Sequence, residues 1–303
     1  MLGVIPAAGL GKRMRPLTDD LPKPLLPVLN KPIIEHVIEH MRAVDVERIV
    51  VVIGYLGDKI KERLKAYDDT DIDIKFVKQE KLDGTVSAIK LAEKYIDEDF
   101  VVMWGDNFFR GNLNDLISSH VEKQAKISVM LEKAEKGARA YIERGRIVRV
   151  EERPKTAGGY AFAGVYVFNP GIFDFVDEVK KSEAGEYEIS DLLQIAIDNG
   201  ENINYAWLEG WRINVTTPLD LLKANLKALD YEGKPFFVGK DCRIEGKVVR
   251  SVIGNHVELK GKAVNSLIMD WSFVYGEIIN VIVRTKGTVC GNYHCSTSIP
   301  CVI

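Results

Sequence analysis

The sequence has few cysteines, and all of them lie in its last quarter. Among 303 residues there are four, Cys242, Cys290, Cys295 and Cys301, and no two of them form a Cys-x-x-Cys pair. This spacing argues against a zinc ribbon or a redox-active pair. We expect small thiols buried in a packed structure. A metal site formed by the last three cysteines with His294 remains the alternative.

Long hydrophobic runs and a strong charge are also missing. The longest apolar runs, such as residues 49–53, are too short to span a bilayer, and no basic-then-apolar leader opens the sequence. A net charge of -3 provides no field that would attract nucleic acid or an anionic membrane. We therefore expect a cytoplasmic protein that binds neither of them. A hydrophobic content of 46% is typical of globular proteins, and the length allows one large or two moderate domains.

A loop rich in glycine, proline and basic residues follows the apolar residues 2–5, which predict a short buried strand. Residues 7–18 have the sequence AAGLGKRMRPLT, and residues 22–28 have the sequence PKPLLPV. Four prolines stiffen the exit from this segment. We call residues 7–28 the N-terminal loop.

The N-terminal loop has the composition that a polyphosphate site requires. Gly9 and Gly11 free the backbone for a tight turn whose N–H groups can face an anion. Arg13, Arg15 and Lys23 add cationic donors within the same loop. The combination favours a site for a nucleoside triphosphate. A glycine-rich turn with solvated basic side chains is the simpler alternative.

Two other phosphate-binding motifs do not match this loop. A dinucleotide fingerprint needs a third glycine at the position of Met14. A P-loop needs four residues between its glycines, whereas only one residue separates Gly9 from Gly11. It also needs Ser or Thr after its lysine, whereas Arg13 follows Lys12. The loop must therefore bind phosphate in another way.

The pattern Gly-x-Gly-x-Arg-x-x-Pro-Leu-Thr, followed by Pro-Lys-Pro-Leu-Leu-Pro-Val, resembles the N-terminal motif of the sugar-1-phosphate nucleotidylyltransferases. The resemblance extends over residues 1 to about 230. It implies a Mg²⁺-dependent enzyme that joins UTP or dTTP to glucose 1-phosphate or N-acetylglucosamine 1-phosphate and releases pyrophosphate. The resemblance assigns nucleotide binding to Ala8, Gly9, Gly11 and Lys12. It assigns catalysis to Arg13 and Lys23. Lys12 departs from the family, which often has a small or hydroxyl residue there.

An acidic residue follows the expected buried strand 100–104, in the sequence Gly105-Asp106-Asn107. Ligands of such folds lie at the carboxyl ends of the strands, and Mg²⁺ prefers one or two protein oxygens beside phosphate oxygens. We therefore expect Asp106 to bind Mg²⁺, with a turn or helix cap as the alternative. The resemblance implies a second ligand at Asn214, where many members have aspartate. Asparagine at this position favours N-acetylglucosamine 1-phosphate as the sugar substrate.

Residues 79–86, with the sequence QEKLDGTV, resemble the family's base-reading loop. The Gln79 amide can donate to and accept from a pyrimidine edge, and Gly84 allows a close backbone approach to the base. Uracil or thymine is therefore favoured over a purine. Thr85 belongs to the same nucleotide-binding set. The alternative is an exposed turn before a helix, with Thr85 as the helix cap.

Residues 150–154, with the sequence VEERP, resemble the family's sugar-binding segment. Glu152 is expected to accept hydrogen bonds from sugar hydroxyls. Arg153 stands where relatives often have lysine and is expected to hold the sugar phosphate. Gly164 is expected to let the backbone approach the sugar ring. A salt-bridged surface hairpin is the alternative.

Apolar runs alternate with helical periodicity from the start of the chain to about position 230. We expect strands and helices in alternation, with strands at 49–53, 72–77 and 100–104 and helices at 33–41, 58–66 and 85–95. Such alternation predicts an α/β fold, a Rossmann-like and mostly parallel sheet with helices on both faces. We therefore expect a catalytic domain over residues 1–230.

Residues 231–303 contain a short internal repeat. Four units begin at an apolar residue, at positions 238, 253, 268 and 283, and each has glycine eight positions later, at Gly246, Gly261, Gly276 and Gly291. A fixed short period of this kind predicts a parallel β-solenoid with one coil per unit. The segment resembles the left-handed β-helix that many members of the family carry, here with about four coils.

The β-helix is expected to support a homo-oligomer. Two alternatives remain open for the whole chain. One is a non-catalytic scaffold protein with the same fold. The other is a dual enzyme with an acetyltransferase site in the β-helix, where the only histidines are His256 and His294.

Overall fold

The computed structural model describes residues 1–68, 70–134, 137–154 and 158–303. The chain divides into two compact units. One, which we call the sheet unit, comprises Met1–Gly9 and Val37–Arg212; the other, the coil unit, comprises Leu10–His36 and Ile213–Ile303. Most of the N-terminal loop thus packs in the coil unit. The domain boundary at residue 230 remains a prediction.

The sheet unit is built on a nine-stranded sheet. Its parallel part has the order β5–β4–β1–β6, with bounds β1 (Leu2–Ala7), β4 (Arg48–Ile53), β5 (Asp73–Lys78) and β6 (Phe100–Met103). The rest is mixed, and consists of β8 (Ile127–Glu132), β9 (Arg139–Glu143), β10 (Arg146–Glu151), β11 (Tyr160–Phe168) and β12 (Ile203–Trp207). Two short strands lie outside this sheet, β7 (Asn107–Arg110) and β13 (Trp211–Asn214). The predicted strands are confirmed, with small differences at their ends.

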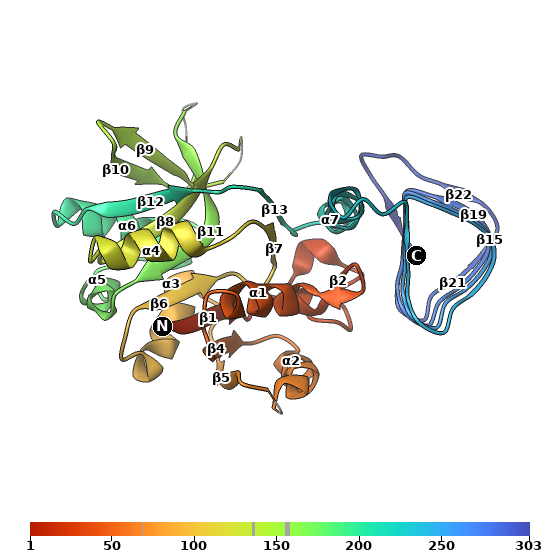
Figure 1. Cartoon of the computed structure of the whole chain (residues 1–303), viewed down its shortest axis with the longest axis horizontal. Helices are drawn as coiled ribbons and strands as arrows, with labels where there is room; N and C mark the ends of the chain where they lie inside the picture. Colours follow the sequence, from red (N-terminus) through yellow and green to blue (C-terminus); the bar gives the residue numbers. More distant parts are fainter. Residues whose placement is uncertain (69, 135–136, 155–157) are drawn as a thin grey trace. The chain divides into compact units, whose positions relative to one another are not determined.

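Helices cover both faces of this sheet (Figure 1). Leu2 and Val4 of β1 belong to a core shared with α3 and α6, whereas Gly3 faces α1, where an added Cβ would lie 2.7 Å from Met41 Sδ. The helices are α1 (Ile33–Arg42), α2 (Gly57–Leu64), α3 (Thr85–Ala92), α4 (Asn114–Glu122), α5 (Phe173–Val176) and α6 (Ile189–Asp198). The predicted Rossmann-like α/β class is confirmed. Every helix in the described part of the chain is too short or too polar to cross a membrane.

The order of the strands in the sheet reverses at β1. In chain order, β4 and β5 are added on one side of β1, and β6 is then added on its other side. In open α/β sheets, ligands bind at the carboxyl ends of the strands beside such a reversal. The Gly105 N–H, just after β6, donates to the Pro6 carbonyl of β1 at 3.1 Å. Residues 8–9 and 105–106 therefore lie at the same sheet edge.

The coil unit contains α7 (Pro218–Tyr231), the hairpin of β2 (Pro27–Val28) and β3 (Lys31–Pro32), and a β-helix. Strands of successive coils pair in parallel, and Arg243, Glu258 and Phe273 occupy equivalent positions in them. One group of strands is β14 (Phe237–Val238), β16 (Val252–Ile253), β18 (Leu267–Ile268), β20 (Val281–Val283) and β23 (Cys301–Val302). The other is β15 (Arg243–Val249), β17 (Glu258–Val264), β19 (Phe273–Ile279), β21 (Thr288–Cys290) and β22 (Tyr293–His294). The predicted parallel β-helix is confirmed, and its left-handedness remains a prediction.

Each coil turns at three corners, which stack along the β-helix (Figure 1). One corner is a column of glycines, and an added Cβ on Gly261 would lie 2.0 Å from the Gly276 carbonyl oxygen. The other two corners are residues with a left-handed backbone, in one column Arg250, Asn265 and Asn280, and in the other Asp241, His256, Trp271 and Lys286. The sequence repeat thus has the same period as the corners at which the chain turns.

The cysteines differ from the expectation of buried thiols. Cys295 and Cys301 form a disulfide, and Cys290 is exposed. The last coil is longer than the others. A 15-residue repeat would pair Val281 with residue 296, but Val281 pairs with Cys301. The extra residues loop out and bring the two cysteines opposite each other. Within the described ranges, no group of three His, Cys, Asp or Glu side chains could hold a metal ion.

One buried side chain attaches the N-terminal loop to α7. The Leu29 N–H donates to Asn225 Oδ1 at 3.0 Å, and Asn225 Nδ2 donates to the Pro27 carbonyl at 3.0 Å. Asn30 Nδ2 in turn donates to the carbonyl of Ile253 in the β-helix at 2.9 Å. The end of the loop that follows Lys23 is therefore fixed by α7 and the β-helix within the coil unit.

The glycine column generates a stability prediction. Gly261→Ala should destabilise the coil unit by about 3 kcal/mol or more, because the methyl group must displace the Gly276 backbone and the residue keeps a positive φ. Gly291→Ala is the matched control, since an added Cβ there meets nothing within 4 Å. Urea unfolding of both variants measures the difference, and equal losses of stability would contradict the stacking argument.

Candidate functional site

Three backbone segments meet closely at the carboxyl edge of the parallel strands. Ala8 follows β1, and its carbonyl accepts a hydrogen bond from the Tyr55 N–H at 3.2 Å. An added Cβ on Gly54 would lie 2.6 Å from the Ala8 carbonyl oxygen, and one on Gly105 would lie 3.2 Å from Ala7 Cβ. A side chain is thus excluded at Gly54, and one at Gly105 would require Ala7 to shift. Backbone groups therefore approach each other closely here, as in sites that bind phosphate groups.

The acidic segment after β6 presents oxygen atoms in the sheet unit. Asp106 is half-buried, and its neighbour Asn107 is fully buried. Asn107 Nδ2 donates to the Ala163 carbonyl at 2.9 Å, but its Oδ1 is buried without a hydrogen-bond partner in the described chain. A carboxylate beside an unsatisfied amide oxygen is a donor set that suits a hard cation. The oxygen atoms of this segment therefore fit Mg²⁺, in agreement with the expectation that Asp106 binds it.

Gly164 lies against this acidic segment. Its φ is 76°, and an added Cβ would lie 2.7 Å from Asn107 Nδ2 and 3.0 Å from Trp104 Cδ1. Trp104 is half-buried and packs on the Tyr166 ring, with centroids 5.4 Å apart. The structure thus brings Gly164 and the Asp106 segment together. Sequence reasoning did not single out Trp104, which lies directly before Gly-Asp-Asn.

Glu152 has a carboxylate neighbour that sequence reasoning also missed. Ser190 Oγ donates to Glu152 Oε2 at 2.7 Å. Burial raises the pKa of Glu188, and the nearby carboxylates of Glu152 and Glu186 raise it further. Arg153 is exposed beside this pair. The two acidic residues at 186 and 188, which directly precede α6, were the only available signal.

The base-reading loop is held by its own side chain. Gln79 is buried, its N–H donates to the Ile53 carbonyl at 2.8 Å, and its Nε2 donates to the Gly84 carbonyl at 3.1 Å. The interpretation of Thr85 as a helix cap is wrong, because Gly84 is the N-cap of α3 and Thr85 is the first helical residue. Thr85 Oγ1 is instead buried without a hydrogen-bond partner among the described residues. Such an atom is available to a ligand.

Tyr187 packs its backbone against the same loop. The Tyr187 N–H donates to the Asp83 carbonyl at 2.8 Å, and the Tyr187 carbonyl accepts from the Val86 N–H at 3.1 Å. An added Cβ on Gly84 would lie 2.4 Å from the Tyr187 nitrogen, so the backbone that approaches Gly84 most closely is that of Tyr187. A cavity of about 490 Å³ lies beside the loop, lined in part by Gln79 and Tyr187. Sequence reasoning missed this support.

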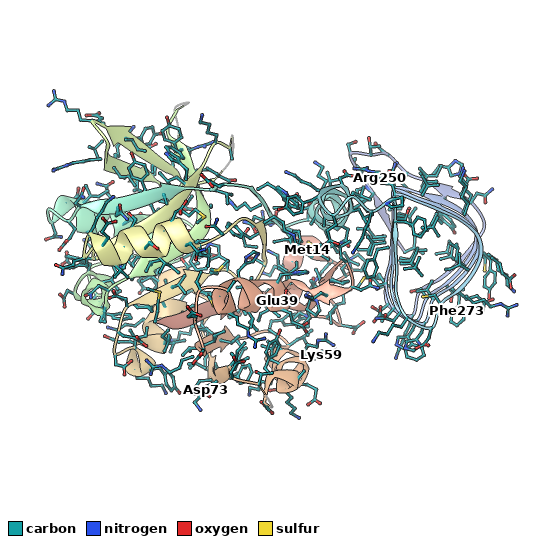
Figure 2. All side chains as sticks on the ribbon, in the orientation of Figure 1. Met14, Glu39, Lys59, Asp73, Arg250 and Phe273 are labelled. Atoms are coloured by element: carbon teal, nitrogen blue, oxygen red, sulfur yellow. A yellow bond between two sulfur atoms is a disulfide. The ribbon has the colours of Figure 1, made fainter. Side chains whose placement is uncertain are left out.

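In the coil unit, the N-terminal loop turns at Gly11, whose φ is 60°. Thr18 Oγ1 donates to the Gly11 carbonyl at 2.8 Å, and the Met14 N–H donates to the same carbonyl at 2.8 Å. Met14 is fully buried (labelled in Figure 2), whereas Lys12 and Arg13 are exposed. The methionine thus anchors a one-turn 3₁₀ helix that presents two cations to solvent.

Lys23 and Asn214 lie at two further places in the coil unit. Lys23 begins a second 3₁₀ helix, Lys23–Leu25. A Cβ added to Gly11 would lie 3.4 Å from the Cβ of Lys23. The structure therefore brings Lys23 and Gly11 together. Asn214 ends β13 and is exposed. Just beyond it, Asp220 Oδ2 accepts four hydrogen bonds from Thr216 and Thr217, which fix the start of α7.

The sequence and the structure are similar to known nucleotidyl transferases. The family model described as nucleotidyl transferase matches residues 2–231. UTP–glucose-1-phosphate uridylyltransferase AglF of Haloferax volcanii is 34% identical over 229 residues, which cover 73% of this chain and 93% of that protein. The bifunctional protein GlmU of Methanococcus aeolicus is 33% identical over 255 residues, 82% of this chain but only 60% of that protein.

A solved structure shares the fold. The crystal structure of a putative glucose-1-phosphate thymidylyltransferase from Bacillus anthracis, in complex with a sucrose, superposes with a TM-score of 0.70. Its sequence is 28% identical, and the match covers 76% of this chain and 96% of that one.

The buried carboxylate Glu188 generates a pH prediction. Since its pKa is raised in the folded chain, its ionisation costs stability as pH rises above the ordinary value of 4.5. Glu188→Gln removes this cost, so the variant should gain thermal stability over the wild type as the pH rises above about 4.5, and match it below. Melting temperatures across this range provide the measurement. Glu183→Gln, at an exposed position, should track the wild type throughout, and a constant difference for Glu188→Gln would contradict the argument.

Proposed function

The chain belongs to the nucleotidyl transferase family and is a sugar-1-phosphate nucleotidylyltransferase, and we propose that it joins UTP or dTTP to a hexose 1-phosphate. A phosphate oxygen of the sugar phosphate attacks the α-phosphorus of the nucleotide. The bond from the α-phosphorus to the oxygen that bridges to the β-phosphate breaks, and pyrophosphate leaves. The observation that carries the proposal is the N-terminal loop, which turns at Gly11 and exposes Lys12 and Arg13.

The N-terminal loop binds the triphosphate and the reacting groups. The backbone of Ala8, Gly9 and Gly11 faces the phosphates, and Lys12 adds a positive charge beside them. Arg13 stabilises the charge that develops on the α-phosphoryl group and on the leaving pyrophosphate, and Lys23 aligns the two substrates. No protein nucleophile is required, because in-line transfer between two held substrates needs positioning and electrostatic stabilisation.

Mg²⁺, when bound, would neutralise charge on the phosphates and would be held by Asp106 and Asn214. The carboxylate of Asp106 beside the unsatisfied Asn107 Oδ1 supports the first assignment. Asn214 contributes a neutral oxygen, so the protein part of this site carries a single negative charge.

Gln79, Gly84 and Thr85 bind the base and its sugar. The Gln79 Nε2 bond to the Gly84 carbonyl uses one N–H and leaves the second N–H and Oε1 for a pyrimidine edge. The buried, unpartnered Thr85 Oγ1 supports a ligand contact at the same end of α3 within the described chain. Uracil and thymine both satisfy this arrangement.

Glu152, Arg153 and Gly164 bind the sugar phosphate. Glu152 accepts from sugar hydroxyls, with its second oxygen held by Ser190, and Arg153 binds the phosphate. The Trp104 ring, beside Gly164, offers an apolar surface to the face of the sugar ring. The substrate is glucose 1-phosphate or N-acetylglucosamine 1-phosphate.

The chain is expected to work in the cytoplasm as a homo-oligomer. Trp271 and Phe273 are 51% and 42% exposed on the outside of the β-helix (Phe273 is labelled in Figure 2). Large exposed aromatic side chains on one element support burial against a second copy.

Pyrophosphate release from crossed pairs of nucleotides and sugar phosphates tests the activity. The five common nucleoside triphosphates are combined with glucose 1-phosphate, N-acetylglucosamine 1-phosphate and galactose 1-phosphate, with Mg²⁺. We expect release with UTP or dTTP and a glucose-type sugar. Silence across the whole panel would instead favour the non-catalytic scaffold.

Arg13 provides the sharpest mutational prediction. Arg13→Ala should lower turnover by about a hundredfold or more, because a charge-stabilising donor at the transferring phosphoryl group is lost. Arg15→Ala is the matched control, since Arg15 is also exposed but pairs with Asp19 at 3.4 Å, and it should retain near-normal turnover. If both variants turn over like the wild type, the assignment of Arg13 is wrong.

A further inference from the structure

The last coil of the β-helix is closed by the disulfide between Cys295 and Cys301, which are six positions apart in the sequence. Residues 296–300 form the loop between them, which we call the end loop. Its hydrogen bonds in the described chain join residues of the loop itself, as the Ile299 N–H does with the Ser296 carbonyl at 3.3 Å. Ile299 is 74% exposed. The end loop is therefore attached to the β-helix through the two cysteines that flank it.

The short strand β23, which begins at Cys301, covers the end of the β-helix. Among the described strands, β20 pairs only with β18 and with β23. The Ile303 N–H donates to the Ile282 carbonyl at 2.9 Å, and the Ile303 carbonyl accepts from the Arg284 N–H at 2.8 Å. The side chains of Cys301 and Ile303 pack on the apolar core that contains Val281. Few residues thus cover this end, and the disulfide ties them to the segment that follows β22.

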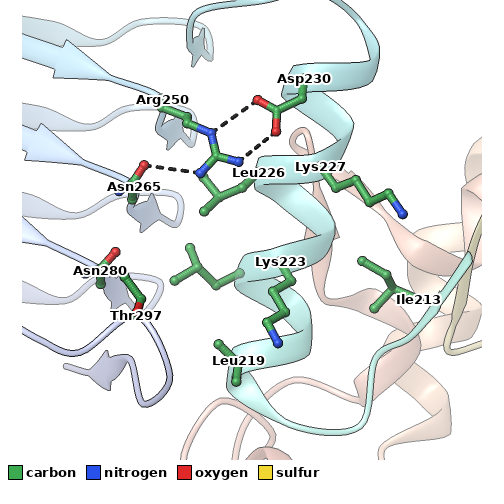
Figure 3. A pocket seen from close by; sticks show the side chains of 11 residues that line it. Ile213, Leu219, Lys223, Leu226, Lys227, Asp230, Arg250, Asn265, Asn280 and Thr297 are labelled. Carbon is green, nitrogen blue, oxygen red and sulfur yellow. Dashed lines mark hydrogen bonds and ion pairs between the residues drawn. The ribbon is translucent and has the colours of Figure 1, made fainter. Parts of the chain in front are cut away.

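The end loop also lies beside α7 in the coil unit. Thr297, in the middle of the end loop, lines a groove of about 510 Å³ together with Leu219 and Leu226 of α7. Figure 3 shows Thr297 next to Asn280, on the β-helix side of this groove. A displaced end loop therefore alters one wall of the groove beside α7, the helix that holds the end of the N-terminal loop through Asn225.

The disulfide is accessible to reagents in solution. Cys295 and Cys301 are only half-buried, and exposed disulfides are the ones that exchange readily with thiols. The chain is expected to work in the cytoplasm, where disulfides are rare and are usually catalytic or redox-sensing. No cysteine is assigned above to the catalytic or substrate-binding set. A redox-sensing role is therefore the one that fits this disulfide.

We propose that the Cys295–Cys301 disulfide is a redox latch, which a soluble dithiol opens and a small-molecule disulfide closes. To open it, one thiolate of the dithiol attacks a sulfur of the latch, the S–S bond breaks, and the released sulfur takes up a proton. The second thiolate of the dithiol then displaces the other protein sulfur from the mixed disulfide. The protein gains two electrons and two protons as thiols, and the dithiol leaves as a cyclic disulfide. Closing transfers the two electrons to the small-molecule disulfide, which leaves as two thiols.

Reduction frees the last coil because little else holds it. Without the cross-link, β23 is a two-residue strand at the end of the chain, and such ends open locally at a low free energy. The outer edge of β20 then loses its partner strand, and Val281 and Val283 lose the cover of Ile303. The strands β15, β17 and β19 keep their pairing along the β-helix. The change is thus confined to the end of the coil unit.

Thiol alkylation of the native full-length protein tests whether the latch opens. The protein is treated with dithiothreitol in the absence of denaturant and quenched with iodoacetamide, and alkylation of Cys295 and Cys301 is read by mass spectrometry. We expect both cysteines to be alkylated well below the melting temperature, and oxidised glutathione should restore the disulfide. A disulfide that is reduced only after the protein has been denatured would overturn the proposal.

Hydrogen exchange, read by mass spectrometry, measures the release of the last coil. Peptides that cover residues 295–303 and the Arg284 amide should exchange faster in the reduced protein by about tenfold or more, as expected when a cross-link that restrains a short terminal strand is lost. Residues 258–264, which form β17 inside the same β-helix, should exchange at an unchanged rate. Equal exchange of the last coil in the oxidised and reduced proteins would overturn the proposal.

Matched cysteine variants assign the effect to the latch. Cys295→Ser with Cys301→Ser should show the fast exchange of the reduced protein whether or not dithiothreitol is present. Cys290→Ser is the control, since Cys290 is an exposed free thiol of the same unit, and this variant should keep the full response. A response that disappears in Cys290→Ser, or that persists in the double variant, would overturn the proposal. None of these measurements uses pyrophosphate release, so their outcome is independent of the proposed activity.

Discussion

The buried side chain of Asn225 is the constraint on which the arrangement of the coil unit depends. It accepts from the Leu29 N–H and donates to the Pro27 carbonyl, and these two residues flank the end of the N-terminal loop, a few positions after Lys23. A buried amide with both ends satisfied fixes two backbone segments in one register, and removing it would leave buried groups unpaired. Helix α7 is itself fixed at its start by the capping box of Thr217 and Asp220. The loop that carries Lys23 thus rests on α7.

This support gives the β-helix a structural role apart from oligomerisation. Asn30 Nδ2 donates to the Ile253 carbonyl, so the first turns of the β-helix hold the same loop that Asn225 holds. In the sheet unit, the corresponding constraint is close backbone packing. Gly54 and Gly84 each lie against another backbone segment at distances that exclude a side chain of their own, and Gly105 packs tightly on Ala7. Both units therefore present their predicted site residues from preorganised backbone, which suits catalysis by positioning.

The sequence was sufficient for features that are local or repeated. The N-terminal loop, the Gly-Asp-Asn segment and the strands of the parallel sheet depend on neighbours within a few residues, and periodicity revealed them. The β-helix was predictable because Gly261 and its equivalents must recur wherever the coil turns. The chemistry of the motifs could likewise be inferred from residue type, as at Arg13 and Gln79.

What the sequence did not reveal depends on contacts between distant segments. Asn225 and Leu29 are 196 positions apart, and Ser190 binds a carboxylate 38 positions earlier. No local pattern marks such partners. The disulfide depends on an insertion in the last coil, whose length only strand pairing shows. Tyr187 supports the base-reading loop through its backbone, so its side-chain identity carries no signal.

The central claim is that nucleotidyl transfer occurs directly between two held substrates, with no covalent intermediate on the protein. Exchange of labelled pyrophosphate into UTP or dTTP tests it most directly. In the absence of a sugar 1-phosphate the account predicts no exchange, because the α-phosphorus has no acceptor. With the sugar 1-phosphate present, label should enter the nucleotide by reversal of the complete reaction. Exchange at a comparable rate without any sugar phosphate would show a nucleotidylated protein and contradict the account.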